Sequence, residues 1–453
     1  MSAFIGAMAA LHADPNMGTA AAFRRPPGAW TAVRLLLSSP AADVAGFGAP
    51  GGRAGALEAT ILTADCGART PGRGDEVRID RLIRHVEAAQ PDALGITWRL
   101  TLSDILSAAV PDPIVGAIRY DAWDAPASAL TQAEQAALSP ASYHARAPFW
   151  ASVTTSVSLP VATQQRIDAE IGAAVTAGLA FWAFLGWDPS DPANAALNLY
   201  RTSTRRTEIG FCMIENMQGL YYLGTWLPNV ARTIGLMGEP GYQKVLGNRP
   251  LLFINAMSDS DIIARFSSLD ATATVIAGIR AQAAAAGVGD PYIVMLDGWS
   301  QRAARLAGYG ADAASAYAAL GTITAPTPYA SLAAAANQWR LDAASHGVDV
   351  VPPLSAGWDY RPRVVTPSSF FGDEANGNPN AFYTAATPAE LTAHVADGIA
   401  WMRANEDAAP AQAALLYAWN EFTEGGFICP TWVAGQPSGD TSRIAALASV
   451  LRA

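Results

Sequence analysis

Apolar and polar residues follow different patterns in the two parts of this chain. Within residues 1–110, segments rich in β-branched residues are separated by Gly/Pro clusters, a pattern typical of short antiparallel strands. The candidate strands cover residues 30–37, 56–63, 76–83 and 95–102, and a short helix is expected before them. The pattern predicts a small β-rich, barrel-like domain at residues 1–110.

Residues 111–453 repeat a different unit, an apolar strand followed by a loop and an Ala-rich helix. The apolar runs cover residues 114–120, 179–187, 210–216, 250–257, 292–297, 311–317, 349–354 and 414–419. Helices are expected between them, for example at 163–177, 259–286 and 388–405. Near-continuous apolar strands that alternate with helices indicate a parallel sheet. Eight such units predict an α/β fold, a (β/α)8 TIM barrel, with a doubly wound sheet as the alternative.

Composition removes several classes of function. With 51% hydrophobic and 15% charged residues, the chain of 453 residues can bury a large core. Its net charge of −10, without a Lys/Arg cluster, argues against a nucleic-acid partner. Cys66, Cys212 and Cys429 are too far apart for a zinc motif, so we expect neither a metal nor another cofactor. Because the longest apolar runs are shorter than about 18 residues, we also expect no membrane insertion.

Several short motifs give the first part a family resemblance. They are HADPN at 12–16, PGAWTAVRLLL at 27–37, GDEVRI at 74–79 and LGITWRLTLSD at 94–104. Together they resemble the small β-barrel head–tail joining proteins of the phage neck. The resemblance implies partners among phage neck, tail or portal proteins, and a virion or extracellular location rather than a cytoplasmic one. An unrelated β-rich cap is the alternative.

In a (β/α)8 barrel, functional residues lie where the strands end, and tryptophans stand beside polar residues at five of the eight expected ends. A sugar ring stacks its C–H face on an aromatic plane and offers hydroxyls to carboxylate or amide groups, so this pattern predicts a carbohydrate groove. For each pair, the alternative is a large apolar residue that caps the barrel beside a solvated acid. The candidate substrate-binding residues are Asp121, Trp123, Trp187, Asp188, Glu215, Asn255, Asp297, Trp299, Trp358, Asp359, Arg361, Trp419 and Asn420.

Two of these residues have a second possible role. Glu215 is either an alternative catalytic acid or a solvated loop charge. Arg361 pairs either with an anionic sugar or with Asp359.

The most specific candidate chemistry lies at the last strand, where Glu421 and Glu424 stand three residues apart. Cleavage of a glycosidic bond uses two carboxyl groups with separated pKa values, one protonated and one ionised. Glu421 ends an apolar strand, and the following Gly425 and Gly426 permit a sharp bend. We therefore predict that Glu421 and Glu424 are the catalytic pair.

The same residues carry a second resemblance, which covers residues 111–453. YAWNEFTEGGFICPT at 417–431 and SAGWDYRPR at 355–363 resemble glycoside hydrolase family 99 and related glycosyltransferase-like, polysaccharide-associated proteins. The resemblance implies that Glu421 acts as base on the substrate 2-hydroxyl and Glu424 as general acid. Phe422 and Thr423 stand where that family has Trp-His, so the sugar and linkage stay open.

These observations lead to two functional hypotheses. The first is a virion-associated glycoside hydrolase that cleaves a polysaccharide or oligosaccharide such as a host capsule or envelope glycan. The alternative is a non-catalytic glycan-binding or structural virion protein built on a hydrolase-like barrel. The geometry of the Glu421 and Glu424 carboxyl groups distinguishes these two hypotheses. Hydrolysis requires both groups to face one pocket with one of them protonated, whereas a Glu424 held in an ion pair favours binding.

Overall fold

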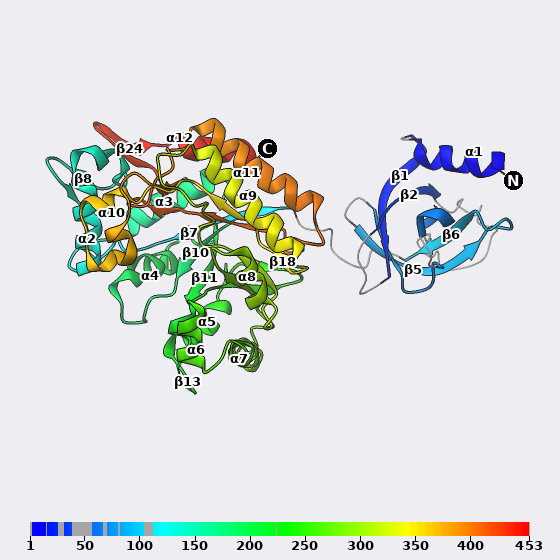
Figure 1. Cartoon of the computed structure of the whole chain (residues 1–453), viewed down its shortest axis with the longest axis horizontal. Coiled ribbons are helices and arrows are strands. Elements are labelled where there is room, and N and C mark those ends of the chain that lie inside the picture. The colour runs from blue at the N-terminus through cyan, green and yellow to red at the C-terminus, as the bar shows by residue number, and fades with distance from the viewer. Residues whose placement is uncertain are drawn as a thin grey trace. The chain divides into compact units, whose positions relative to one another are not determined.

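The computed structural model describes residues 2–14, 16–25, 31–38, 57–66, 70–79, 82–103, 112–222 and 224–452 (Figure 1). The chain divides into two compact units, Met1–Asp112 and Pro113–Ala453. Each unit has its own hydrophobic core. We therefore describe them one at a time.

The first unit is a closed antiparallel barrel of six strands in the order β1-β2-β3-β6-β5-β4. Its elements are α1 (Ser2–Ala13), β1 (Gly18–Arg24), β2 (Thr31–Ser38), β3 (Leu57–Leu62), η1 (Thr63–Cys66), β4 (Glu76–Ile79), β5 (Leu82–Pro91) and β6 (Thr97–Leu102). Alternate residues face inward, and Leu35, Ile61, Val77 and Leu100 are completely buried. The predicted β-rich, barrel-like fold is confirmed.

Two details of this barrel differ from the sequence prediction. The expected strand at 76–83 is two strands, β4 and β5, which pair with each other in antiparallel fashion. Strand β1 was not predicted, because its sequence GTAAAFR contains only one β-branched residue. It belongs to the sheet because β2 and β4 pair with it on either side and close the barrel.

The second unit has eight parallel strand positions. In chain order these are β7 (Ile114–Arg119), β10 (Phe181–Leu185), β11 (Gly210–Asn216), β15 (Arg249–Asn255), β16 (Tyr292–Leu296), β17 (Ala313–Ser315), β18 (Asp349–Val350) with β19 (Pro353–Ser355), and β20 (Ala413–Tyr417). Each position pairs with its neighbour in the chain, and β20 pairs with β7. All eight predicted apolar runs therefore supply a strand.

The seventh strand closes the ring although it is divided into β18 and β19. Between these two pieces, the N–H of Val351 donates to the carbonyl of Ala314 next to β17, at 3.0 Å. On the other side, the N–H of Leu415 in β20 donates to the carbonyl of Pro352 at 3.1 Å. Pro352 has no N–H to give, which interrupts the regular ladder. The predicted (β/α)8 barrel is confirmed, and the doubly wound alternative is wrong.

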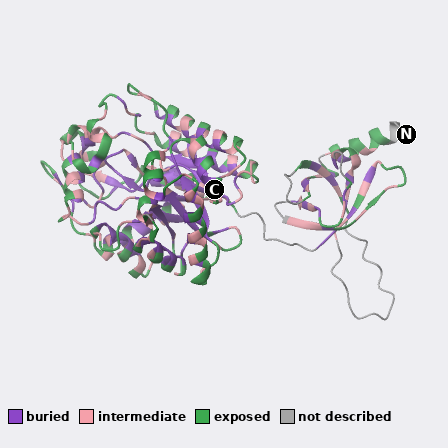
Figure 2. Cartoon of the chain, turned by 60° about the horizontal axis from the view of Figure 1, so that its bottom comes forward, coloured by how far each residue is buried: buried purple, intermediate pink, exposed green. Residues whose placement is uncertain are grey.

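Helices cover the outside of this barrel, and buried residues concentrate on the strands (Figure 2). They are α2 (Ala129–Leu138), α3 (Gln164–Ala177), α4 (Ala195–Thr202), α5 (Pro228–Met237), α6 (Asp259–Phe266), α7 (Ala271–Ala285), α8 (Ser300–Ala307), α9 (Tyr329–Ser345), α10 (Arg361–Val365), α11 (Pro388–Ala404) and α12 (Ser442–Leu451). The expected helix at 259–286 is divided because Ser267 adopts a left-handed conformation with φ of 74°. Helix α11 begins with a capping box between Thr387 and Glu390.

Short elements connect the main ones. They are η2 (Ala141–Arg146), β8 (Ser152–Val153), β9 (Val157–Ser158), η3 (Pro192–Asn194), η4 (Met217–Gly219), β12 (Tyr221–Tyr222), β13 (Thr225–Trp226), β14 (Lys244–Val245), η5 (Ser369–Asn376), β21 (Asn420–Glu421), β22 (Gly426–Phe427), β23 (Thr431–Val433) and β24 (Gln436–Asp440). Among the residues that the structure describes, no single helix has the length and apolar character needed to cross a membrane. Only the α6–α7 pair, bent by 67°, passes that test jointly.

Candidate active site

Glu421 and Glu424 lie in a tight hairpin that follows β20. Strand β21 pairs with β22, and Glu421 is opposite Gly426. A side chain at Gly426 would collide with the ring of Tyr417, and Gly425 adopts a φ of +74°. The two glycines therefore let the chain turn back over Tyr417, which leaves Glu421 and Glu424 only 2% and 6% exposed.

One arginine connects both glutamates. Arg363 of α10 donates to Oε2 of Glu421 at 3.4 Å and to Oε1 of Glu424. The same guanidinium contacts Glu134 of α2 at 2.9 Å and Glu374 of η5 at 2.7 Å. We call Arg363 and these four glutamates the carboxylate cluster. It places four carboxyl groups around one cation.

Burial, with this excess of carboxyl groups, leaves a proton on Glu421. Burial raises the pKa of Glu421 to about 8, and repulsion from Glu134 adds to the rise although Arg363 opposes it. The hydroxyl of Tyr317, which follows β17, lies 2.8 Å from Oε1 of Glu421. Burial also raises the pKa of the Glu374 carboxyl. Glu421 is thus the shielded, protonated group that an acid catalyst needs.

Glu424 has the opposite surroundings. Arg363 donates to its Oε1 and the hydroxyl of Tyr417 donates to its Oε2, so both oxygens accept hydrogen bonds. Two donors of this kind stabilise the ionised carboxylate. The pair is therefore divided into one protonated and one ion-paired group. The resemblance implied the reverse roles, and the ion pair of Glu424 is the feature that favours binding without cleavage.

The predicted aromatic rim is wrong for two of its five tryptophans. Trp123 and Trp419 are completely buried. Trp123 packs edge-on against Phe422 with ring centroids 5.0 Å apart. Trp419 packs against Trp182 at 5.3 Å. These large rings fill the interior of the barrel mouth, where they gain more from burial than from exposure to a ligand.

The other three tryptophans keep some contact with solvent. Trp187 is half-buried against Tyr120, with ring centroids 5.8 Å apart, and the Tyr120 hydroxyl lies 3.1 Å from Glu134. Trp358 is half-buried against Tyr417 at 5.3 Å. Both therefore touch a tyrosine whose hydroxyl bonds a glutamate of the carboxylate cluster. Trp299 is 79% exposed.

Four of the acids predicted to bind substrate are buried and already have protein partners, so the alternative of solvated acids is wrong for them. Asp121 pairs with Arg119 at 2.8 Å, and Glu215 is bonded to Thr233 and to Asn229 of α5. Asp297 and Asp359 are buried in ion pairs with arginines. Only Asp188 is exposed, and its carboxylate holds Ser190 in a turn.

Glu215 is not the solvated loop charge that one alternative proposed, since it is completely buried, and it lies outside the carboxylate cluster. Burial raises the pKa of its carboxyl, while Thr233, Arg232 and Asn229 oppose the rise. Its partners lie on or beside α5 and not in the carboxylate cluster.

The remaining predicted residues fix the backbone or each other. Arg361 donates to Asp359 at 2.6 Å, so it pairs with that acid as one alternative proposed. Burial alone raises the pKa of Asp359, but Arg361 and Arg146 outweigh it and leave the pKa below its ordinary value. Asn420 bonds both backbone groups of Tyr120. Asn255 is half-buried and bonds Asn216.

A second group of charges lies nearby, and we call it the paired cluster. Arg119 contacts Asp121 at 2.8 Å and Glu170 at 2.7 Å. Arg166 contacts Glu170 at 3.1 Å and also Asp124. All five are buried. The cluster therefore sets two cations against three acids inside the unit.

Sequence analysis did not identify Arg363, Glu134, Tyr317 and Tyr417. A charge within the apolar face of α2 was the available signal for Glu134, and Arg363 stands in the SAGWDYRPR motif itself. Nothing in the sequence indicates that these residues meet, since Glu134 and Arg363 are 229 positions apart.

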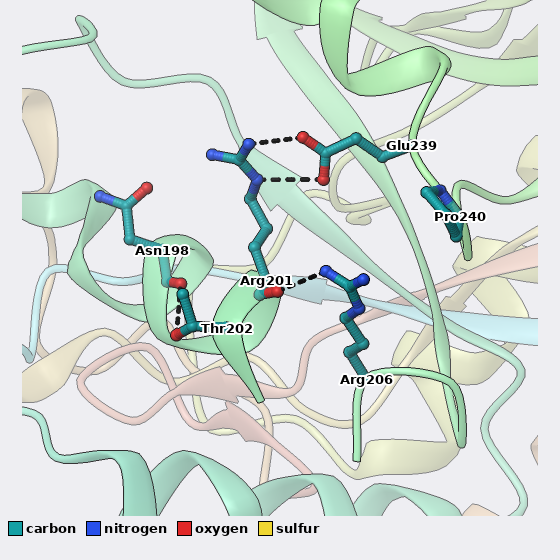
Figure 3. A pocket seen from close by; sticks show the side chains of 6 residues that line it. All are labelled: Asn198, Arg201, Thr202, Arg206, Glu239 and Pro240. Atoms are coloured by element: carbon teal, nitrogen blue, oxygen red, sulfur yellow. Dashed lines mark hydrogen bonds and ion pairs between the residues drawn. The ribbon is translucent and has the colours of Figure 1, made fainter. Parts of the chain in front are cut away.

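The cavity beside α4, the metal-ligating residue types and the cysteines provide no second catalytic site in the described part of the chain. A cavity of about 400 Å³ lies between α4 and the segment after α5, where Arg201 is already paired with Glu239 (Figure 3). Within the described ranges, no three His, Cys, Asp or Glu side chains form a group that could hold a metal ion. The three cysteines are buried and free.

The chain is similar to known proteins in part of its sequence and in its fold. Residues 1–102 match the family of phage head–tail attachment proteins. No curated protein matches the chain. A GH99 endo-alpha-mannosidase from Bacteroides thetaiotaomicron is similar in structure at 15% identity, over 75% of this chain and 96% of that chain, with TM-scores of 0.46 and 0.44 in two structures. A glucosidase from Croceicoccus marinus is similar at 10% identity, over 62% and 63% of the chains, with a TM-score of 0.34.

Proposed function

We propose that this protein is a glycoside hydrolase that cleaves a polysaccharide or oligosaccharide, carried on a unit that attaches it to a phage particle. The observation that supports hydrolysis is the protonated carboxyl of Glu421. Burial raises its pKa to about 8, and the guanidinium of Arg363 brings Glu421 and Glu424 together. The match of residues 1–102 to head–tail attachment proteins supports the place in a virion.

In this proposal Glu421 is the general acid and Glu424 the base. Glu421 gives its proton to the leaving glycosidic oxygen as the bond to the anomeric carbon breaks. Glu424 takes a proton from a water molecule as the water oxygen forms its bond to the anomeric carbon, so that both products end in hydroxyl groups. Negative charge thus moves from Glu424 to Glu421, and both remain beside Arg363. No uncompensated charge is created in the buried site, which would be costly at low dielectric.

The phage role concerns the first unit. A head–tail attachment domain serves contacts with neck, tail or portal proteins, and we propose that the six-stranded barrel makes such contacts. The barrel of the second unit would then present its strand ends to a glycan of the bacterial host. A location in the virion follows from this arrangement.

Binding without cleavage is the second candidate, and a specific observation favours it. The Glu424 carboxylate is held by Arg363 and Tyr417, and both glutamates are more than nine-tenths buried. A base that is already satisfied by two donors takes a substrate proton less readily. In that case Trp187, Trp358 and Trp299 would hold a glycan that the protein does not cut.

The test compares the wild-type protein with Glu421→Gln and Glu424→Gln on a glycan panel, with products identified by mass spectrometry. Glu215→Gln is the matched control, since Glu215 is a buried barrel glutamate outside the carboxylate cluster. Cleavage by the wild type and the control, lost in both other variants, would support the hydrolase. Binding by all four proteins without any product would favour the second candidate.

A further inference from the structure

Trp299 is the most exposed of the described tryptophans at the barrel mouth. It lies between β16 and α8, and 79% of its surface is open to solvent. A tryptophan gains a large free energy from burial, so one held in the open needs an explanation. The four other rim tryptophans are buried or half-buried, which makes Trp299 the exception.

The backbone of Trp299 is firmly anchored. Its N–H donates to Oδ1 of Asp297 at 2.9 Å, and its carbonyl accepts the first-turn bond of α8 from Ala303. Asp297 is itself paired with Arg302, and its carbonyl accepts the indole N–H of Trp339 at 3.1 Å. The backbone that carries the exposed ring is therefore held in place from both sides.

A hollow of about 430 Å³ lies against Trp299, which is within the range of small-molecule sites. Trp339 and Leu320 give it further apolar lining. Gln338 and Asp342 of α9 also line it, and the Gln338 amide donates to the Asp342 carboxylate at 2.7 Å. An indole plane beside a carboxamide and a carboxylate matches the C–H face and the hydroxyl groups of a sugar.

Charge indicates which sugars fit. Arg302 and Arg305, on the other side of Trp299, both bond Asp259, and Arg302 also bonds Asp297. Their charges are thus neutralised within the protein, and the hollow beside α9 presents Asp342 as its charged group. An anionic sugar would meet this carboxylate without a cation to balance it. A neutral sugar meets only hydrogen-bond acceptors and donors there and is not repelled by the Asp342 carboxylate.

The loop after β17 connects this hollow to the carboxylate cluster. Tyr317 reaches Glu421 from this loop, and Leu320, three residues later, lines the hollow. A glycan chain seated against Trp299 therefore lies beside the same loop that contacts the proposed general acid. None of the residues that line the hollow belongs to the carboxylate cluster.

We propose that Trp299, Gln338 and Asp342 form a binding subsite for a neutral sugar unit of a polysaccharide, separate from the carboxylate cluster. The choice of a glycan as ligand rests on the proposed function, but binding here does not require cleavage. Trp299 supplies the stacking surface, and the α9 side chains bond hydroxyl groups.

Affinity gel electrophoresis tests this subsite with mannan, dextran, galactan and xylan as neutral probes and polygalacturonate as the anionic one. The wild type should be retarded by at least one neutral polysaccharide and not by polygalacturonate. Trp299→Ala should weaken that interaction roughly tenfold, since aromatic stacking is lost. Gln338→Ala should weaken it severalfold. Tyr222→Ala is the matched control, because Tyr222 is an exposed aromatic outside the hollow, and it should be retarded like the wild type.

Three results would overturn the subsite: no retardation by any neutral probe, retardation by polygalacturonate alone, or equal retardation of wild type and Trp299→Ala. Thermal melting of each variant establishes that it is folded. We expect the Trp299 variant to fold, because the replaced side chain is exposed. The outcome for the hydrolase proposal is independent of this test. If Trp299-dependent retardation is found but no product is formed, the subsite stands and the cleavage proposal falls.

Discussion

The two buried charge clusters of the second unit differ in their balance. The carboxylate cluster sets four glutamates against Arg363, whereas the paired cluster sets three acids against Arg119 and Arg166. They are neighbours along the chain. Trp419 donates to Glu170 in one, and Glu421, two residues later, belongs to the other.

This difference in balance decides how the acids titrate. In the paired cluster, burial alone raises the pKa of Glu170, but Arg119 and Arg166 outweigh it and leave the pKa below its ordinary value. Asp121 is another acid of the paired cluster. Burial raises its pKa to about 6, although Arg119 opposes the rise. In the carboxylate cluster, burial raises the pKa of Glu421 to about 8. A surplus of acids thus keeps a transferable proton near neutral pH, and a nearly balanced set holds charge in place.

The largest expected effect concerns catalysis. Glu421→Gln and Glu424→Gln should each lower the hydrolysis rate by about 10²–10⁴-fold, since each removes a proton-transfer group. Glu421→Gln should not lower the melting temperature, because an amide stays neutral without the proton that the folded protein must keep on Glu421. Rates and melting curves of the same preparations check this. Unchanged hydrolysis in either variant would contradict the division of roles.

Removal of the single cation should damage folding most. Arg363→Met leaves four glutamates without a counter-charge and should lower the free energy of unfolding by about 3–5 kcal/mol. Arg119→Met should cost less, because Arg166 still neutralises Glu170. Urea unfolding of both variants gives the two values. A greater loss of unfolding free energy in Arg119→Met than in Arg363→Met would contradict this prediction.

Stability should depend on pH in opposite directions in the two clusters. Below the ordinary carboxyl pKa of 4.5, Glu421 is protonated in both folded and unfolded protein. As pH rises from there to about 8, only the folded protein keeps this proton, so its contribution to stability is progressively lost. Glu170 has a lowered pKa, so its contribution is present at neutral pH and is lost as pH falls.

Unfolding free energies measured between about pH 3 and pH 9 separate these contributions. Relative to the wild type, Glu421→Gln should flatten the decline toward high pH, and Glu170→Gln should leave that decline in place. Equal slopes in wild type and Glu421→Gln would show that another group holds the proton.

The smallest effect is expected outside both clusters. Asp188 is exposed and bonds only Ser190 among its side-chain partners in the described residues. Asp188→Asn should change the free energy of unfolding by less than about 0.5 kcal/mol. Thermal melting measures this small change. A loss of stability as large as that of Arg119→Met would show that burial does not explain why substitutions in the two clusters destabilise the protein.

The sequence reveals the strands of the second unit because parallel strands buried on both faces are apolar throughout. It does not reveal the direction in which a rim side chain points. Trp123 and Trp299 each stand near an acid at a strand end, yet one is completely buried and the other is 79% exposed. Pairing between distant segments is also invisible, as with Thr423 and Glu134, which are 289 positions apart. The carboxyl pair could be found because both members lie in one short hairpin.

Closure of the first unit limits how a partner can recognise it. Within the described residues, each of the six strands bonds a neighbour on both sides, since β1 pairs with both β2 and β4. Among the described residues, no strand of the barrel is therefore left unpaired along its whole edge, the form of edge that an incoming strand would extend. A phage protein that joins this unit must recognise side chains on the outer wall or the connections between strands. Specificity at such a joint is set by residues that can change without disturbing the barrel.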